Sequence, residues 1–104
     1  MTRERRSSPQ TLLLLSAFLE RPRVWRHGYE LSAETQLKSG TIYPALMRLG
    51  DRGFLDDKTE PSSLPGRPPR RLYRLTTSGL AFAKAELSAA EQLLTAAHPL
   101  PGRA

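Results

Sequence analysis

Cysteine is absent from the 104 residues of this chain. Its absence excludes disulfide bonds, thiol catalysis and metal sites built from thiolates, and with them the class of small secreted proteins that disulfides hold together. Long apolar runs are absent too: the longest is Leu12–Leu15, whereas a membrane-spanning helix needs roughly 18 apolar residues. The basic N-terminus resembles the start of a signal peptide, but Ser16 and Glu20 interrupt the apolar stretch that follows. We therefore expect a cytoplasmic protein.

The sequence also lacks a catalytic or metal-binding set. His27 and His98 have no partner at a metal-ligand spacing. Asp56 and Asp57 are neighbours in a predicted strand and so point to opposite faces, which does not suit a pair of acid/base residues. The serine pair at 62–63 has no activating base nearby, and there is no glycine-rich phosphate loop. We therefore expect no enzyme, no cofactor and no metal.

Positive charge dominates what is present. Lys and Arg number 16 against 10 Asp and Glu, which gives a formal net charge of +6 and favours an anionic partner. Only Lys38, Lys58 and Lys84 are lysines, so arginine, whose planar fork suits phosphates and guanine edges, carries most of the charge. At this length we expect one domain rather than a two-domain enzyme, with a modest core that a partner chain could complete.

Capping residues and apolar periodicity predict two helices in the first third of the chain. One is capped by Ser8, runs to about Glu20 and ends before Pro22, because proline disfavours helical geometry in the residue before it. A second, short helix covers roughly residues 28–35. The side chains expected to be buried are Leu12, Leu14, Leu15, Phe18 and Leu19 in the first helix and Tyr29 and Leu31 in the second.

A third helix is predicted after Ser39, which is a good N-cap residue. The apolar residues that follow recur at helical spacing: Ile42, Leu46 and Leu49. Pro44 stands near the fifth helical position, where we expect a slight opening of the first turn rather than a break. Gly53 is expected to end the helix in the left-handed conformation.

The apolar period changes to that of strands after Gly53. Residues 54–58 and 71–75 are short strand candidates, and residues 60–70 between them contain four prolines, one glycine and two arginines. Two strands around such a segment predict a hairpin with a basic loop.

A last helix, capped by Thr76, is predicted to reach about Ala97 and to end at His98 and Pro99. Two rows of apolar residues repeat every seven positions along it: Leu80, Leu87 and Leu94, and Ala83, Ala90 and Ala97. Such rows form a seam like that of a coiled coil. Because so small a chain has nothing left to pack on this seam, we expect a second copy to cover it. The residues expected at that contact are Leu80, Ala83, Leu87, Ala90 and Leu94.

Three helices followed by a strand, a basic loop and a strand is the element order of a winged helix-turn-helix. This is a mainly α fold with a small β-hairpin wing, in which the third helix enters the major groove of DNA and the hairpin touches the flanking backbone. The predicted division of the chain is a flexible basic N-terminus (1–7), a winged-helix DNA-binding domain (8–75), a C-terminal dimerisation helix (76–98) and a flexible tail (99–104).

Four segments resemble the PadR family of transcriptional regulators, in its form with a short C-terminal region. They are His27–Leu31, Ser39–Leu49, Gly53–Leu55 and Tyr73–Gly79. The resemblance covers about Leu12 to Glu91, which is nearly the whole domain.

The resemblance implies a repressor-like homodimer that binds double-stranded DNA at a pseudo-palindromic site. Its recognition helix corresponds to Ser39–Arg52, its wing to Thr59–Arg71, and its last helix joins two subunits, which places two recognition helices about one DNA turn (~34 Å) apart. A small-molecule effector that favours one spacing of these helices over another would then regulate binding. The wing is richer in proline than the family leads us to expect.

The third helix presents polar and basic groups, together with Met47, on the face opposite its apolar stripe. Hydroxyls there can donate to phosphate oxygens, the exposed amides at the helix start point their dipole at anions, and Arg48 can reach a guanine edge or a phosphate. The residues expected to contact DNA are Lys38, Ser39, Gly40, Thr41, Tyr43, Pro44 and Arg48 in this helix and Arg67, Arg70 and Arg71 in the wing. The alternative is an ordinary solvated face, with Tyr43 half-buried beneath the wing.

Other residues carry two interpretations each. Arg74 is expected to face solvent or to pair with Asp56 or Asp57. Trp25 suits packing in the core or at an interface, and a stacking platform for a flat ligand is the alternative. The N-terminal arginines form either a solubilising, disordered start or an arm that contacts DNA: these are Arg3, Arg5 and Arg6.

A winged helix used as a protein-interaction module is the alternative function. In that case the last helix docks a different chain and the arginines only solubilise the protein. Attraction to anionic lipid is a third interpretation, which the last helix disfavours because Lys84 is its only lysine or arginine.

Overall fold

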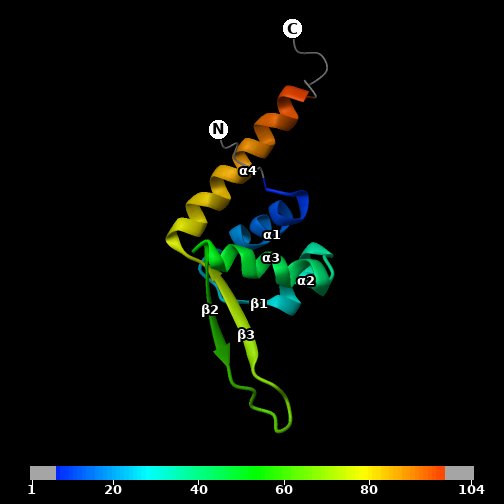
Figure 1. Ribbon diagram of the computed structural model, residues 1–104, viewed down its shortest axis with the longest axis vertical. Helices are drawn as coiled ribbons and strands as arrows, with labels where there is room; N and C mark the ends of the chain where they lie inside the picture. The colour runs from blue at the N-terminus through cyan, green and yellow to red at the C-terminus, as the bar shows by residue number, and fades with distance from the viewer. Residues whose placement is uncertain (1–6, 98–104) are drawn as a thin grey trace.

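The computed structural model describes residues 7–97, and it consists of helices with one small sheet (Figure 1). Predictions for Arg3, Arg5, Arg6, His98 and the tail at 99–104 lie outside these residues. The elements in chain order are α1 (Pro9–Glu20), β1 (Arg26–His27), α2 (Gly28–Thr35), α3 (Ser39–Asp51), β2 (Leu55–Glu60), β3 (Arg70–Leu75) and α4 (Thr77–Ala97). Within residues 7–97, no helix combines the length and apolar character that crossing a bilayer demands.

The sheet is antiparallel, with β3 in the centre between β1 and β2. Strands β2 and β3 form the predicted hairpin, in register at Leu55 with Leu75 and at Asp57 with Tyr73. Its tip, residues 61–69, points away from the helices (Figure 1). The two-residue strand β1 was not predicted, because so short a segment has no periodicity to read.

The core forms where the three N-terminal helices, the base of the hairpin and the start of α4 meet. Its most deeply buried side chains are Leu14, Leu15, Phe18, Leu31, Ile42, Leu46 and Ala83. The predicted apolar stripe of the third helix is confirmed. That of the first helix is confirmed at Leu14, Leu15 and Phe18, whereas Leu12 and Leu19 are only half-buried. The prediction that Tyr29 is buried is wrong, since Tyr29 is 82% exposed: α2 has only two turns, and its inward face carries Gly28, Leu31 and Thr35.

Side-chain caps fix two of the helix starts. The Ser8 hydroxyl accepts from the Thr11 amide at 3.1 Å, and the Thr76 hydroxyl accepts from the Gly79 amide at 2.9 Å, as predicted. Gly53 adopts φ 82°, which confirms the left-handed end of α3.

The start of α3 differs from the prediction by one residue. Lys38 is the N-cap, and Ser39 is the first helical residue rather than the cap. The Lys38 carbonyl accepts from both the Thr41 and Ile42 amides at 2.9 Å, so backbone bonds close the first turn and no hydroxyl cap is needed. Helix α3 continues through Pro44 to Asp51 without a break.

Helix α4 folds back onto its own chain along its first half. Ala83 is fully buried in the core, and Leu80 and Phe82 pack against it. Further along, the Glu86 carboxylate accepts from the Ser7 amide at 3.2 Å beside α1. This corrects the expectation that the whole seam lacks a partner within the chain: α1 covers its beginning, so Ala83 has no surface left for a second copy.

The junction between α3, the hairpin and α4 is tightly packed. The rings of Phe54 and Phe82 stack with centroids 4.1 Å apart, and the Arg52 guanidinium lies over both rings at 4.9 and 5.0 Å. Gly79 lies so close to Phe54 that an added Cβ would come within 1.9 Å of the Phe54 carbonyl oxygen. The same oxygen accepts from the Thr76 amide at 3.1 Å. The start of α4 is therefore held directly against the base of the hairpin.

Candidate nucleic-acid interface

The face of α3 opposite the core is exposed, as its periodicity predicted. Its outward residues are Thr41, Tyr43, Pro44, Met47 and Arg48, and at the helix start Lys38, Ser39 and Gly40 are exposed as well. Helix α3 runs across the molecule above the hairpin, with α2 beside its first turns (Figure 1). The surface of α3 and the hairpin therefore belong to one continuous region.

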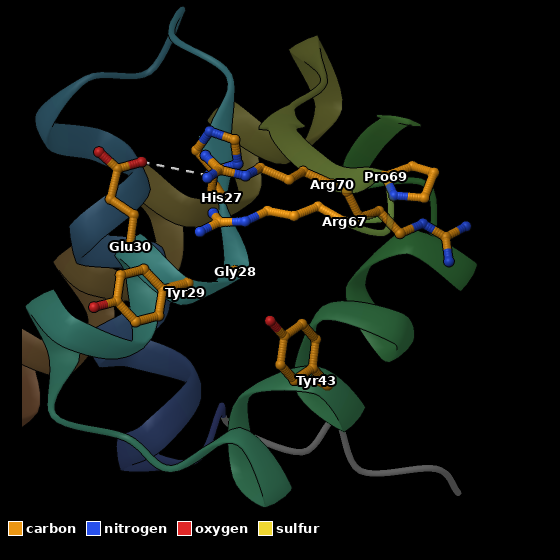
Figure 2. A pocket seen from close by; sticks show the side chains of 9 residues that line it. His27, Gly28, Tyr29, Glu30, Tyr43, Arg67, Pro69 and Arg70 are labelled. Carbon is orange, nitrogen blue, oxygen red and sulfur yellow. Dashed lines mark hydrogen bonds between the residues drawn. The ribbon is translucent and has the colours of Figure 1, made fainter. Parts of the chain in front are cut away.

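A cavity of about 620 Å³ lies where the start of α2, α3 and the wing meet. Figure 2 shows Arg67 and Arg70 reaching from the wing toward His27, with the rings of Tyr29 and Tyr43 on the helical side. The residues that line it are His27, Gly28, Tyr29, Glu30, Tyr43, Arg67, Pro69, Arg70 and Arg71. Three of the predicted wing residues and Tyr43 are thus brought together, while Thr41, Pro44 and Arg48 lie on α3 outside this lining.

The start of α2 contributes residues that the sequence reasoning missed. Glu30 accepts from the His27 amide at 3.3 Å and so satisfies one free donor of the helix start, while the His27 Nδ1 atom is buried without a hydrogen-bond partner among residues 7–97. Gly28 lies against Tyr43, since an added Cβ would be 2.6 Å from the Tyr43 hydroxyl oxygen. The dipole of α2 adds partial positive charge to the cavity. The available signal was the His27–Leu31 segment, whose pattern predicts only a short helix and whose motif carries part of the family resemblance.

Arg71 and Arg74 of β3 differ in their contacts. Arg71 forms an ion pair with Asp57, Nη2 to Oδ2 at 2.8 Å, so part of its charge is neutralised on the sheet. Arg74 lies over Trp25, with its guanidinium carbon 4.2 Å from the ring centroid, and Lys58 lies 4.7 Å from the same ring. The expectation that Arg74 faces solvent or pairs with an aspartate is therefore wrong, because its guanidinium lies over the indole. Trp25 itself is half-buried and contacts both cations.

A buried arginine supports the cavity from behind, and the sequence reasoning missed it. Arg26 in β1 is fully buried. Its Nη1 donates to the Ala17 carbonyl at 3.0 Å, its Nε donates to Glu30 at 3.2 Å, and its Nη2 donates to Glu34. Exposed Arg21 adds a longer ion pair to Glu34 at 3.6 Å. This network joins α1, β1 and α2 into one unit.

The pKa shifts in this network show that the charges stabilise each other. Burial by itself would lower the pKa of Arg26, but the hydrogen bonds that it donates to Glu34 and Glu30, together with their negative charges, outweigh this effect and the pKa is raised. Burial would likewise raise the pKa of Glu30, but Arg26 outweighs it and the pKa is lowered. Glu30 is therefore held in its charged form by Arg26, its nearest cation.

Three packed helices with a β-hairpin beside the third define a winged helix, and solved structures share this fold. A PadR-like transcription factor from Bacteroides fragilis is similar over 85% of this chain and 87% of its own, at 25% identity and a TM-score of 0.65. A PadR-like transcriptional regulator from Bacillus cereus is similar over 90% of this chain and 92% of its own, at 24% identity and a TM-score of 0.67. The PcaV transcriptional regulator from Streptomyces coelicolor, solved in complex with its natural ligand, is similar over 95% of this chain and 67% of its own, at 24% identity and a TM-score of 0.68.

The family model described as the transcriptional regulator PadR-like family matches residues 17–85. The chain therefore belongs to the PadR-like family of transcriptional regulators, as its motifs indicated. A search of curated protein sequences found no match. The family and the structures above are transcriptional regulators rather than enzymes.

Proposed function

We propose that this protein is a sequence-specific DNA-binding repressor that acts as a homodimer on a pseudo-palindromic operator. The observation that carries the proposal is the cavity in which Arg67 and Arg70 of the wing face Tyr43 of α3 and the start of α2. Such a site presents positive charge, hydroxyl donors and a helix dipole to one space, which suits a phosphate of the DNA backbone. Family membership supports the same conclusion.

In the proposed complex, α3 lies in the major groove of the DNA. The sugar-phosphate backbone of the DNA lies between α3 and the wing. The hydroxyls of Tyr29 and Tyr43 can donate to phosphate oxygens, while Arg67 and Arg70 neutralise phosphates and release condensed counterions. Arg48, exposed and outside the cavity, is free to reach a guanine edge. Arg71 contributes less in this scheme, because Asp57 already holds its guanidinium.

Substituting the wing arginines Arg67 and Arg70 should reduce the salt dependence of DNA binding. In a double variant Arg67→Ala/Arg70→Ala, we expect the slope of log affinity against log salt to fall by about 4, because each subunit of the dimer loses two phosphate contacts and each lost contact removes about one unit. The measurement is a fluorescence titration of duplexes selected from a random pool, at several salt concentrations. Arg48→Ala should instead weaken binding to the selected sequence by about 1–3 kcal/mol and relax its specificity.

Arg23→Ala is the matched control for these variants. Arg23 is exposed and belongs to neither the cavity nor α3, so its loss should leave the salt slope nearly unchanged. One weak affinity for every duplex, in the unmodified protein, would contradict a specific regulator. If DNA binding were absent while a partner protein still bound through α4, the protein-interaction alternative would hold.

Dimerisation is proposed through the second half of α4. Beyond the part that packs on α1, Leu93 and Leu94 are 50% and 63% exposed on a helix that extends past the rest of the structure (Figure 1). Leu87 and Ala90 are half-buried and continue the same surface. Ala83 is left out of the contact, since its own core covers it. A small-molecule effector that changes the spacing of two α3 helices stays a prediction.

Leu94→Asp should convert the protein from a dimer to a monomer, because a carboxylate would have to be buried in the apolar contact. Light scattering coupled to gel filtration measures this directly. Leu64→Asp is the control: Leu64 is 53% exposed at the tip of the wing, so the same charge there should leave the dimer intact. A dimer that persists in Leu94→Asp would place the interface elsewhere.

A further inference from the structure

The outermost line of α3 carries an unusual set of side chains. Steps of four, three and four residues place Gly40, Pro44, Met47 and Asp51 along one line of the helix. This line lies opposite the buried stripe that includes Ile42 and Leu46. It is the part of α3 that would enter a groove most deeply.

The first three members of this line offer almost no hydrogen-bonding capacity. Gly40 has no side chain, the Pro44 ring is apolar, and Met47 ends in a thioether, a weak acceptor only. Met47 is nevertheless 68% exposed, one of the largest exposures among the bulky apolar residues of the described chain. An exposed apolar strip of this kind marks a contact surface rather than a solvated face.

Charge around the strip favours DNA as its partner. Lys38 and Arg48 stand beside it on the exposed surface, and the wing arginines lie across the cavity next to Tyr43. The acidic member, Asp51, is at the C-terminal end, where it would repel phosphates. The strip therefore fits a polyanion through the first three turns of α3, from Gly40 to Arg48.

Internal packing does not account for the glycine at position 40. A Cβ added to Gly40 would meet nothing within 4 Å among residues 7–97. The chain could therefore accommodate alanine there, which is also the better helix former. Glycine at this position instead allows the helix backbone to approach a partner closely.

On the basis of the proposed function, we propose that α3 reads thymine C5-methyl groups rather than mainly hydrogen-bonding edges. Pro44 and Met47 supply the apolar contacts, and the Thr41 methyl group adds to them from the flank. Arg48 then supplies the hydrogen-bonded base contact, to guanine. In the major groove only thymine presents a methyl group, so an apolar strip is a direct means of discrimination.

The test removes methyl groups from the DNA without changing its hydrogen bonds. Duplexes are first selected from a random pool by the full-length protein, and each thymine of the selected half-site is then replaced by deoxyuridine. We expect at least one position per half-site at which affinity falls about fourfold, as the burial of one methyl-sized group implies. Met47→Ala should abolish this difference at its position, whereas Met47→Leu should keep it.

Arg48→Ala is the matched control, because it should lose the guanine preference and keep the difference between thymine and deoxyuridine. If no sequence is enriched from the pool, the proposed function itself fails. If a sequence is enriched but deoxyuridine binds equally well at every position, the reading of methyl groups is wrong and the proposed function stands. Discrimination that is unchanged in Met47→Ala also overturns the inference.

Discussion

Arg26→Ala is expected to destabilise the protein by about 3–5 kcal/mol, the usual cost of removing one partner of a buried ion pair. Arg26 is fully buried and is the common partner of Glu30, Glu34 and the Ala17 carbonyl. Its removal leaves a void in the centre of the network and two carboxylates that lose their nearest charge. Since the free energy of unfolding of native proteins is only about 5–15 kcal/mol, this loss should leave the variant largely unfolded at moderate urea concentrations. Urea unfolding followed by circular dichroism measures the change.

Arg21→Ala is the matched control for this experiment. Arg21 contacts the same two glutamates at 3.6 and 4.0 Å, but its side chain is 55% exposed. Exposed pairs contribute about 0–1 kcal/mol, so the control should differ little from the unmodified protein. Equal losses in the two variants would show that burial of Arg26 is not what matters.

The destabilisation caused by Arg26→Ala should depend on pH, because Glu30 is a titratable partner of Arg26. Because the pKa of Glu30 is lowered in the folded state, its carboxylate stabilises the protein above the ordinary value of about 4 and loses that contribution as the pH falls through the lowered value. The gap in unfolding free energy between the unmodified protein and Arg26→Ala should therefore narrow in acid. A gap that is constant from neutral pH to pH ~3 would contradict this assignment.

Gly79→Ala should destabilise the protein by about 1–3 kcal/mol, although alanine is the better helix former. The added methyl group would lie 1.9 Å from the Phe54 carbonyl oxygen, which is backbone and cannot rotate away. The start of α4 would have to shift, and with it the Thr76 amide bond and the stacked pair of Phe54 and Phe82. Thermal unfolding gives the magnitude, and near-ultraviolet circular dichroism reports the altered ring packing.

Gly50→Ala provides the comparison for Gly79→Ala. Gly50 is also in a helix, but an added Cβ there would meet nothing within 4 Å in the part of the chain that the structure describes. This variant should be neutral or slightly more stable, because alanine costs less backbone entropy in a helix. A Gly79→Ala protein as stable as Gly50→Ala would show that the junction is not as tight as the distances indicate.

The order of the helices and of the hairpin could be predicted from the sequence because several of their ends have a local signal. Ser8 and Thr76 are caps, Gly53 ends α3, and the leucines of α1 and α3 repeat at helical spacing. These features depend on residues within a turn or two of one another. The family motifs are local in the same sense, and the match of the family model to residues 17–85 confirms the resemblance that they indicated.

Contacts between distant segments could not be predicted in the same way. Arg26 lies in a basic stretch that looks like a solvated linker, and its burial depends on Glu30, Glu34 and the end of α1 meeting around it. The partner of Arg74 likewise depends on the register that brings β1 beside β3. The cavity of the candidate interface could not be predicted either, because its lining depends on where α2 lies relative to α3 and the wing, and periodicity does not reveal that position.

The contact between α1 and α4 has a consequence for how the chain is made. Leu14, Leu15 and Phe18 leave the ribosome well before Ala83, which shares their core. Until then the part of α1 that packs against α4 stays uncovered, although α2 and α3 can already cover the rest of its apolar side. A polypeptide truncated before α4 would leave this apolar surface exposed and would be prone to aggregate.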